Sequence, residues 1–201
     1  MVTAARAAGV RRVVKLSVWR APEELTPIAR LHRPVEQALA DSGLEWTLLR
    51  PNFYMQNFLR LMARSIRATR SFSQPESRAP VSFVDARDVA QVAAHVLTSP
   101  GHEGRSYDLT GPQALTFDQA ASVLSDVIGS RVTFAGISDD QARAVMLADG
   151  LPLGYVESLI EVARAYRDGG AQRVTSSVQD LIGRPATSFA AFVRDHRAEF
   201  I

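Results

Sequence analysis

The sequence of 201 residues contains no cysteine, so a disulfide framework and thiolate chemistry are both excluded. A reducing compartment is consistent with this absence, and we expect a cytoplasmic protein. No apolar run approaches the roughly 18 residues that span a bilayer. The chain also opens without the charged and apolar regions of a secretory signal. We therefore expect a globular protein that has no membrane partner.

Lysine is nearly absent too, because Lys15 is the one lysine among 23 basic residues. This bias is typical of genome composition rather than of function. The formal net charge is only +2, so a nucleic-acid partner is not expected. The sequence predicts no metal site either, because its histidines lack ligand spacing: His32, His95, His102 and His196.

A glycine-rich turn between a strand and a helix is also missing. The first eighteen residues have the pattern of a helix end, a turn at Gly9 and a buried strand that is apolar apart from Lys15 and Ser17. A dinucleotide-binding fold normally opens with a strand, a glycine-rich turn and a helix that holds the pyrophosphate. The pattern predicts the carboxyl-terminal part of such a fold, truncated before these residues and incomplete for cofactor binding by itself.

Apolar β-branched runs alternate with helical patterns along the chain, which predicts an α/β fold built on a Rossmann-like, doubly wound parallel sheet. We expect strands at 12–18, 45–50, 81–84, 106–110 and 132–137. Helices are expected at 28–41, 55–68, 86–98, 117–128, 139–149, 153–168 and 188–198. The polar, proline-bearing segment 71–80 has the composition of a surface loop.

The pattern indicates one compact unit over residues 1–201, with a sheet core in 1–115 and a mainly helical, substrate-side part in 116–201.

Thr26 and Pro27 are typical of a helix cap and a first helical position. Pro34 lies inside the same helical pattern. Because proline removes a backbone hydrogen bond, we expect this helix either to restart near Arg33 or to kink.

Several segments, taken in order, resemble the NmrA-like atypical short-chain dehydrogenases. They include VTAARAAGVRRVVKLS, LHRPVEQALADSGLEWTLLRPNFYMQN, FVDARDVAQVAAHVL, GHEGRSYDLTGPQALTF and IGRPATSFAAFVRDH. The family contains NAD(P)H-dependent quinone and azo reductases, and regulators that bind the dinucleotide without redox chemistry. The resemblance covers essentially all 201 residues. The family's own first, glycine-rich portion has no counterpart in this sequence.

The resemblance implies roles for particular residues. In the family, a serine after the first of these strands and a pair of side chains on the next helix carry out proton transfer. The resemblance therefore assigns Ser17, His32 and Glu36 as catalytic. Pro51, Asn52 and Phe53 would approach the nicotinamide of NAD(P)H and the substrate. The chain departs from many relatives after the strand, where Val18 and Trp19 replace a second serine and a small residue.

The residues themselves leave other interpretations open. His32 and Glu36 lie on one helix face, as a proton relay or as a simple surface pair. Ser17 is a catalytic hydroxyl or one bonded to nearby backbone. Ser17, His32 and Asp85 could form a hydrolytic triad, although the sequence around Ser17 lacks the nucleophile elbow of such enzymes. Asp85 is otherwise expected to cap a helix.

The predicted function is an NAD(P)H-dependent oxidoreductase that acts on a small carbonyl or quinone-like substrate. The alternatives are a non-redox ligand-binding or regulatory protein and a cofactor-independent isomerase or cyclase. Without a neighbouring strand, Val13–Val18 would form an open sheet edge. We therefore expect this edge to be covered by self-association into a homo-oligomer, by a chain that supplies the missing half, or by local rearrangement.

Overall fold

A three-stranded parallel sheet forms one half of the molecule. The computed structural model describes residues 2–201, so Met1 of the predicted opening helix lies outside the described residues. The strand order is β1-β2-β4, and the strands span Arg12–Leu16, Glu45–Pro51 and Arg105–Leu109. Both pairings are parallel, which confirms the predicted fold class.

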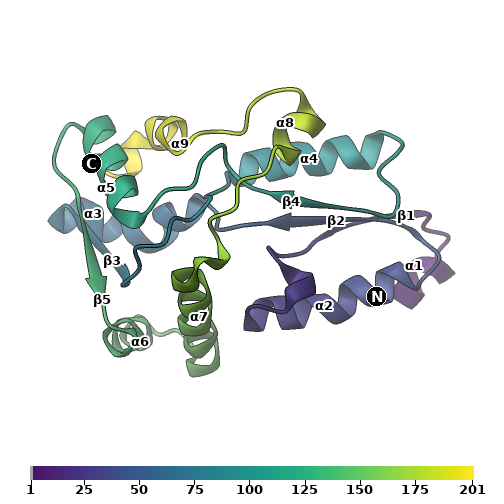
Figure 1. Cartoon of the computed structure of the whole chain (residues 1–201), viewed down its shortest axis with the longest axis horizontal. Helices are drawn as coiled ribbons and strands as arrows, with labels where there is room; N and C mark the ends of the chain where they lie inside the picture. The colour runs from purple at the N-terminus through teal and green to yellow at the C-terminus, as the bar shows by residue number, and fades with distance from the viewer. Residues whose placement is uncertain (1) are drawn as a thin grey trace.

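Helices cover both faces of this sheet. In Figure 1, α1 and α2 lie on one side, and α4 and α8 lie on the other. These helices span Val2–Ala7, Pro27–Ala40, Ala86–Thr98 and Ser177–Ile182. Valines of α4 pack against Leu49 of β2 and Leu109 of β4 in one buried cluster. The layers are therefore held together by apolar burial, which is the main stabilising contribution in such a fold.

The second half contains two further parallel strands, β3 and β5, over Ser71–Pro75 and Thr133–Ile137. The largest aromatic cluster of the chain lies beside them, with Phe58 and Phe83 in edge contact at 5.3 Å between ring centroids. The surrounding helices are α3, α5, α6, α7 and α9, over Ala63–Thr69, Phe117–Ile128, Asp139–Ala148, Leu153–Ala165 and Phe189–Asp195.

Several predicted boundaries require correction. The predicted helix 55–68 is a π-helical turn at Phe58–Met62 followed by α3. The predicted helix 153–168 ends at Ala165 and continues as a second π-helical segment, Tyr166–Gly170. The predicted helix 188–198 is α9 and a short 3₁₀ turn at Arg197–Glu199. In the π-helical segment Gly169 has φ 85°, which ends regular helix there.

Two other predictions about local structure were wrong, and one helix was missed. Residues 71–75 of the predicted surface loop form β3, because they pair with β5 and the side chains of Phe72 and Pro75 are buried. The predicted strand 81–84 makes only isolated bridges, since the Ser82 amide bonds the carbonyl of Ala171 instead of a neighbouring strand. The helix α8 was not predicted.

Helix α2 runs unbroken from Pro27 to Ala40 with Pro34 inside it, so it does not restart near Arg33. The side chain of Thr26 caps it, as predicted, by accepting the amide of Ala29 at 3.1 Å. Continuity across the proline matters because it keeps both candidate residues of this helix on one face.

Strand β1 lies at the sheet edge and pairs only with β2 among residues 2–201. The sequence predicted it to be buried on both faces, but its residues are half-buried and Leu16 is 54% exposed. Beyond Leu16, the amides of Ser17 and Trp19 still bond to carbonyls of Leu49 and Pro51. In the described part of the chain, no helix has both the length and the apolar character to cross a membrane.

Candidate functional site

A buried ion pair lies where β1 and β2 end. Glu36 of α2 is 1% exposed and accepts hydrogen bonds from Arg50 of β2, from Nε to Oε1 at 2.9 Å and from Nη2 to Oε2 at 2.8 Å. The hydroxyl of Ser17, just after β1, donates to the same carboxylate at 2.6 Å. Three elements thus converge on one carboxylate, at the sheet edge where ligands bind in open α/β folds.

These contacts set the charge of Glu36. Burial by itself raises the pKa of this carboxyl, but the hydrogen bonds from Arg50 and Ser17 outweigh it and bring the pKa below its ordinary 4.5. The carboxylate therefore stays ionised at neutral pH and holds the Ser17 hydroxyl and the Arg50 guanidinium in place.

His32 lies one turn before Glu36 on α2 but contacts a different residue. Its Nδ1 lies 2.8 Å from Nζ of Lys15, and no hydrogen bond joins it to Glu36 within residues 2–201. Glu36 does not orient the ring, because this carboxylate is already engaged by Arg50 and Ser17. Burial and the Lys15 charge lower the pKa of His32 below its ordinary 6.5.

Trp19 fastens the loop after β1 to the other half of the molecule. Its indole is 3% exposed and donates from Nε1 to the carbonyl of Gly170 at 2.7 Å. The guanidinium of Arg173 lies 5.1 Å from the centre of the ring. The large residue at this position therefore fixes the end of β1 against the π-helical segment Tyr166–Gly170.

Asn52 of the predicted cofactor loop is buried and uses its whole side chain internally. Its Nδ2 donates to Ser82 and to the carbonyl of Ala171, at 2.8 and 2.9 Å. Its Oδ1 accepts from the Phe53 amide at 2.9 Å and from the Tyr166 hydroxyl at 3.0 Å. An amide side chain has two donors and two acceptor positions, so its hydrogen-bonding capacity is filled.

The neighbours of Asn52 are also packed into the protein. Phe53 is half-buried, with ring centroids 5.4 Å from Phe83 and 6.4 Å from Phe58. Pro51 is buried, and its carbonyl accepts the Trp19 amide at 2.9 Å. Contact of Pro51, Asn52 and Phe53 with a cofactor stays a prediction, and the Asn52 side chain has no hydrogen-bonding capacity left for it.

Asp85 has a structural role, as one of the two interpretations expected. It caps α4 by accepting the Arg87 amide at 2.8 Å, and it also accepts hydrogen bonds from the side chains of Gln56 and Arg87. Ser17 and His32 have other partners, so the three side chains form no hydrolytic triad. No cluster of metal-ligating side chains is found over residues 2–201.

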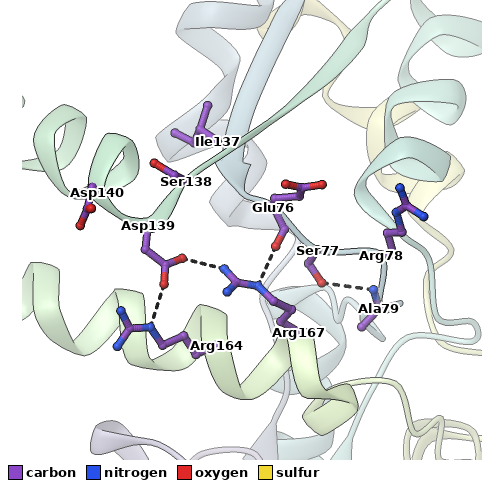
Figure 2. Close-up of a pocket in the computed structure, with 10 residues that line it drawn as sticks. All are labelled: Glu76, Ser77, Arg78, Ala79, Ile137, Ser138, Asp139, Asp140, Arg164 and Arg167. Carbon is purple, nitrogen blue, oxygen red and sulfur yellow. Dashed lines mark hydrogen bonds and ion pairs between the residues drawn. The ribbon is translucent and has the colours of Figure 1, made fainter.

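An open pocket of about 670 Å³ lies at the carboxyl ends of β3 and β5. Figure 2 shows Arg164 and Arg167 of the α7 region converging on Asp139, with nitrogen–oxygen distances of 2.7 and 2.6 Å. Arg167 also donates from Nε to the carbonyl of Glu76 at 2.8 Å. The charges of Arg164, Arg167 and Asp139 offset one another in part, whereas the Glu76 and Arg78 side chains, which also line the pocket, form no ion pair within residues 2–201.

The sequence interpretation missed Arg50 and Lys15 as partners of the candidate residues. A signal for Lys15 was present, because alternation along a strand places it on the same face as Ser17. The matching signal in α2 is the four-residue spacing of His32 and Glu36, which places both toward that face. Arg50 gave no such signal, because nothing in the sequence around it pointed to Glu36 of α2.

A model of the NmrA-like family matches residues 1–187 of this chain. The chain belongs to the NmrA-like family. This NmrA-like chain is 36% identical over 201 residues to the NAD(P)H azoreductase of Xenophilus azovorans, covering 100% of this chain and 70% of the relative. It is 39% identical over 202 residues to the (4-alkanoyl-5-oxo-2,5-dihydrofuran-3-yl)methyl phosphate reductase of Streptomyces griseus, covering 100% and 71%.

A solved structure with the same fold is the NADPH-dependent quinone oxidoreductase of Escherichia coli. It matches the NmrA-like chain with a TM-score of 0.89 and 31% identity, over 98% of this chain and 71% of that one. The resemblance predicted from the sequence segments is therefore confirmed, together with the Rossmann-like α/β architecture.

Proposed function

We propose that this chain is an NAD(P)H-dependent oxidoreductase that reduces a small carbonyl or quinone-like substrate. The observation that carries the proposal is the buried Ser17–Glu36–Arg50 network beside His32, at the ends of β1 and β2. The names of the similar proteins support it, because they describe an azoreductase, a (dihydrofuranyl)methyl phosphate reductase and a quinone oxidoreductase.

In this proposal His32 delivers a proton to the heteroatom of the substrate. Glu36 acts as the fixed charge that holds Ser17 and Arg50, because its carboxylate already accepts three hydrogen bonds from them. The Ser17 hydroxyl donates a hydrogen bond to Glu36. Its oxygen can still accept a hydrogen bond from a ligand. The proton chemistry is thereby concentrated at the sheet edge formed by the carboxyl ends of β1 and β2.

NAD(P)H would supply a hydride when bound. The proposal assigns half-buried Phe53, an aromatic side chain, and half-buried His32, a polar one, to its nicotinamide end. The described residues do not fit its phosphates, because no glycine-rich turn joins a strand to a helix within the 201 residues. We propose that these residues alone bind the dinucleotide weakly.

Calorimetric titration with NADPH and NADH tests the cofactor assignment. Consumption of reduced nicotinamide in the presence of a quinone, an azo dye or an unsaturated lactone tests the reaction. We expect turnover with at least one acceptor whenever the dinucleotide is bound, and loss of most of it in His32→Ala. Binding without turnover would favour a regulatory protein, whereas turnover that needs no dinucleotide would favour an isomerase or cyclase.

We also propose that the open edge of β1 is covered, by a second copy of this chain or by a polypeptide with a glycine-rich turn. Half-buried strand residues and the 54% exposure of Leu16 support this proposal. An exposed edge strand presents unpaired backbone groups that readily pair with another chain.

A further inference from the structure

The contact between Lys15 and His32 fixes the tautomer of the histidine ring. Nζ of Lys15 lies 2.8 Å from Nδ1 of His32. An ammonium group has three donors and no acceptor, so Nδ1 must accept. A neutral imidazole with an accepting Nδ1 carries its proton on Nε2. The geometry therefore assigns the Nε2–H form to His32.

Nε2 of His32 is available to hydrogen-bond a ligand. His32 is half-buried, and within residues 2–201 its Nε2 makes no hydrogen bond to the protein. The ring thus presents a donor on one side while its other side is held by Lys15. Such an arrangement suits proton transfer through the ring, from one nitrogen to the other.

Lys15 has no carboxylate partner that would explain its position. In the described part of the chain it forms no salt bridge within 4.0 Å, although Glu36 lies nearby on α2, because Arg50 of β2 and Ser17 hold that carboxylate. Arg33 of α2 also faces Glu36, at 3.7 Å. Its ammonium donates to the exposed Leu16 carbonyl at 3.3 Å, so its contact with His32 at 2.8 Å is the shorter of its two hydrogen bonds and the one to a titratable group.

The other charged groups around α2 are occupied elsewhere. On the side where α2 meets α7, Arg30 pairs with Glu161 at 2.5 Å. The charges that act on His32 are therefore those of Lys15 from β1 and Glu36 from its own helix. Burial together with the charge of Arg50 lowers the pKa of Lys15, while Glu36 opposes this effect.

We propose that Lys15 and His32 form a proton relay for the reduction, an inference that rests on the proposed function. Bound NAD(P)H would supply the hydride, and Nε2 of His32 would then give its proton to the substrate oxygen or nitrogen. In the same step Nδ1 takes a proton from the Lys15 ammonium, so the ring stays neutral and Lys15 becomes an amine. Solvent then protonates Nε2, and the Nδ1 proton returns to Lys15.

Lys15 acts through His32 and touches no substrate in this scheme, so it is a positioning residue and proton source. Its position on an edge strand is consistent with that role, since β1 brings Lys15 and Ser17 to the same face beside α2. Reduction of a carbonyl or an azo group consumes one proton for each hydride, which the relay provides.

Nitrogen-15 NMR of the histidine ring tests the tautomer independently of any activity. The His32 resonances are assigned from their loss in His32→Gln. We expect the Nε2–H pattern in the unmodified chain and a mixture of tautomers in Lys15→Met. Arg33→Met is the matched control, because it removes a nearby cation without removing the Nδ1 donor. An Nδ1–H pattern in the unmodified chain, or an unchanged pattern in Lys15→Met, overturns the relay.

The pH dependence of kcat/KM gives the second readout. The relay requires neutral His32 and charged Lys15, so the profile should be bell-shaped. In Lys15→Met the imidazolium itself must donate, so the rate should rise toward low pH and fall about 100-fold at neutral pH. Lys15→Arg should restore the tautomer but little of the rate, because guanidinium does not release its proton.

The two readouts separate failure of the relay from failure of the proposed function. A Lys15→Met variant with the rate and profile of the unmodified chain overturns the relay and leaves the reductase assignment intact. An unmodified chain that binds dinucleotide but reduces no acceptor overturns the proposed function, and the relay with it. Circular dichroism of each variant shows whether the fold is retained.

Discussion

The guanidinium of Arg50 donates two hydrogen bonds to the buried carboxylate of Glu36, at 2.9 and 2.8 Å. The two residues lie on β2 and α2, so this pair fastens the helix that carries His32 to the sheet. Holding a buried carboxylate beside a half-buried guanidinium is costly, and their attraction offsets that cost only while both are present. The pair therefore does more to fix the arrangement of the site than to stabilise the fold.

Replacing Arg50 by methionine should be strongly destabilising, because it leaves the Glu36 charge buried without its partner. We expect a loss of about 3–5 kcal/mol in the free energy of unfolding. Urea denaturation followed by circular dichroism measures this loss. The double variant Arg50→Met, Glu36→Leu should recover a large part of it, and a double variant as unstable as the single one would contradict the account.

The pH dependence of stability should identify Glu36 separately. Its pKa is lower in the folded state than the ordinary 4.5, so it contributes stability above that value. This contribution is lost as the pH falls through the folded-state pKa. Glu36→Gln should therefore show a smaller loss of unfolding free energy between neutral and acidic pH. Parallel curves for the two proteins would contradict the assignment.

Trp19→Phe should weaken the connection between the loop after β1 and the segment that ends at Gly170. The phenyl ring keeps most of the apolar contact but leaves the buried Gly170 carbonyl without its donor. The expected cost is about 1–3 kcal/mol. Trp46→Phe is the matched control, because the half-buried indole of Trp46 makes no hydrogen bond within residues 2–201. Equal costs for both substitutions would contradict this prediction.

Gly111 and Gly154 provide a paired test of local packing. A Cβ atom on Gly111 would collide with the backbone carbonyl of Phe83, whereas one on Gly154 would meet nothing within 4 Å. Gly111→Ala should lower the free energy of unfolding by about 1–3 kcal/mol or more. Gly154→Ala, in helix α7, should raise it by up to about 1 kcal/mol. Thermal unfolding of both variants measures the difference, and a stabilised Gly111→Ala would be contradictory.

Local signals in the sequence were sufficient for much of the fold. The helix predicted at 86–98 matches α4, since its apolar period and the cap at Asp85 lie close together in the chain. The four-residue spacing of His32 and Glu36 likewise predicted one shared helix face, and these side chains contact Lys15 of β1 and Ser17 just after it.

Contacts between distant segments could not be predicted in the same way. The segment Ser71–Pro75 is mostly polar and ends in proline, and it becomes a strand only through its pairing with β5. Glu36 was assigned to His32 because the two are close in sequence. Its actual partner, Arg50, lies on a strand that folds against α2, and no local pattern reports such a contact. The site therefore required the tertiary structure.

The open edge of β1 leads to a prediction about assembly. Leu16 is 54% exposed at the end of this strand, and a covered edge would bury it. If the edge is covered by a second copy, light scattering after size exclusion should give twice the mass of one chain.

Leu16→Lys should shift the protein toward monomer without unfolding it, because a lysine on an edge strand opposes pairing. Leu61→Lys is the matched control, since Leu61 is 59% exposed in the π-helical turn before α3, away from this strand. A folded monomer at micromolar concentration would show that self-association does not cover β1 and would leave a separate polypeptide as the proposed cover.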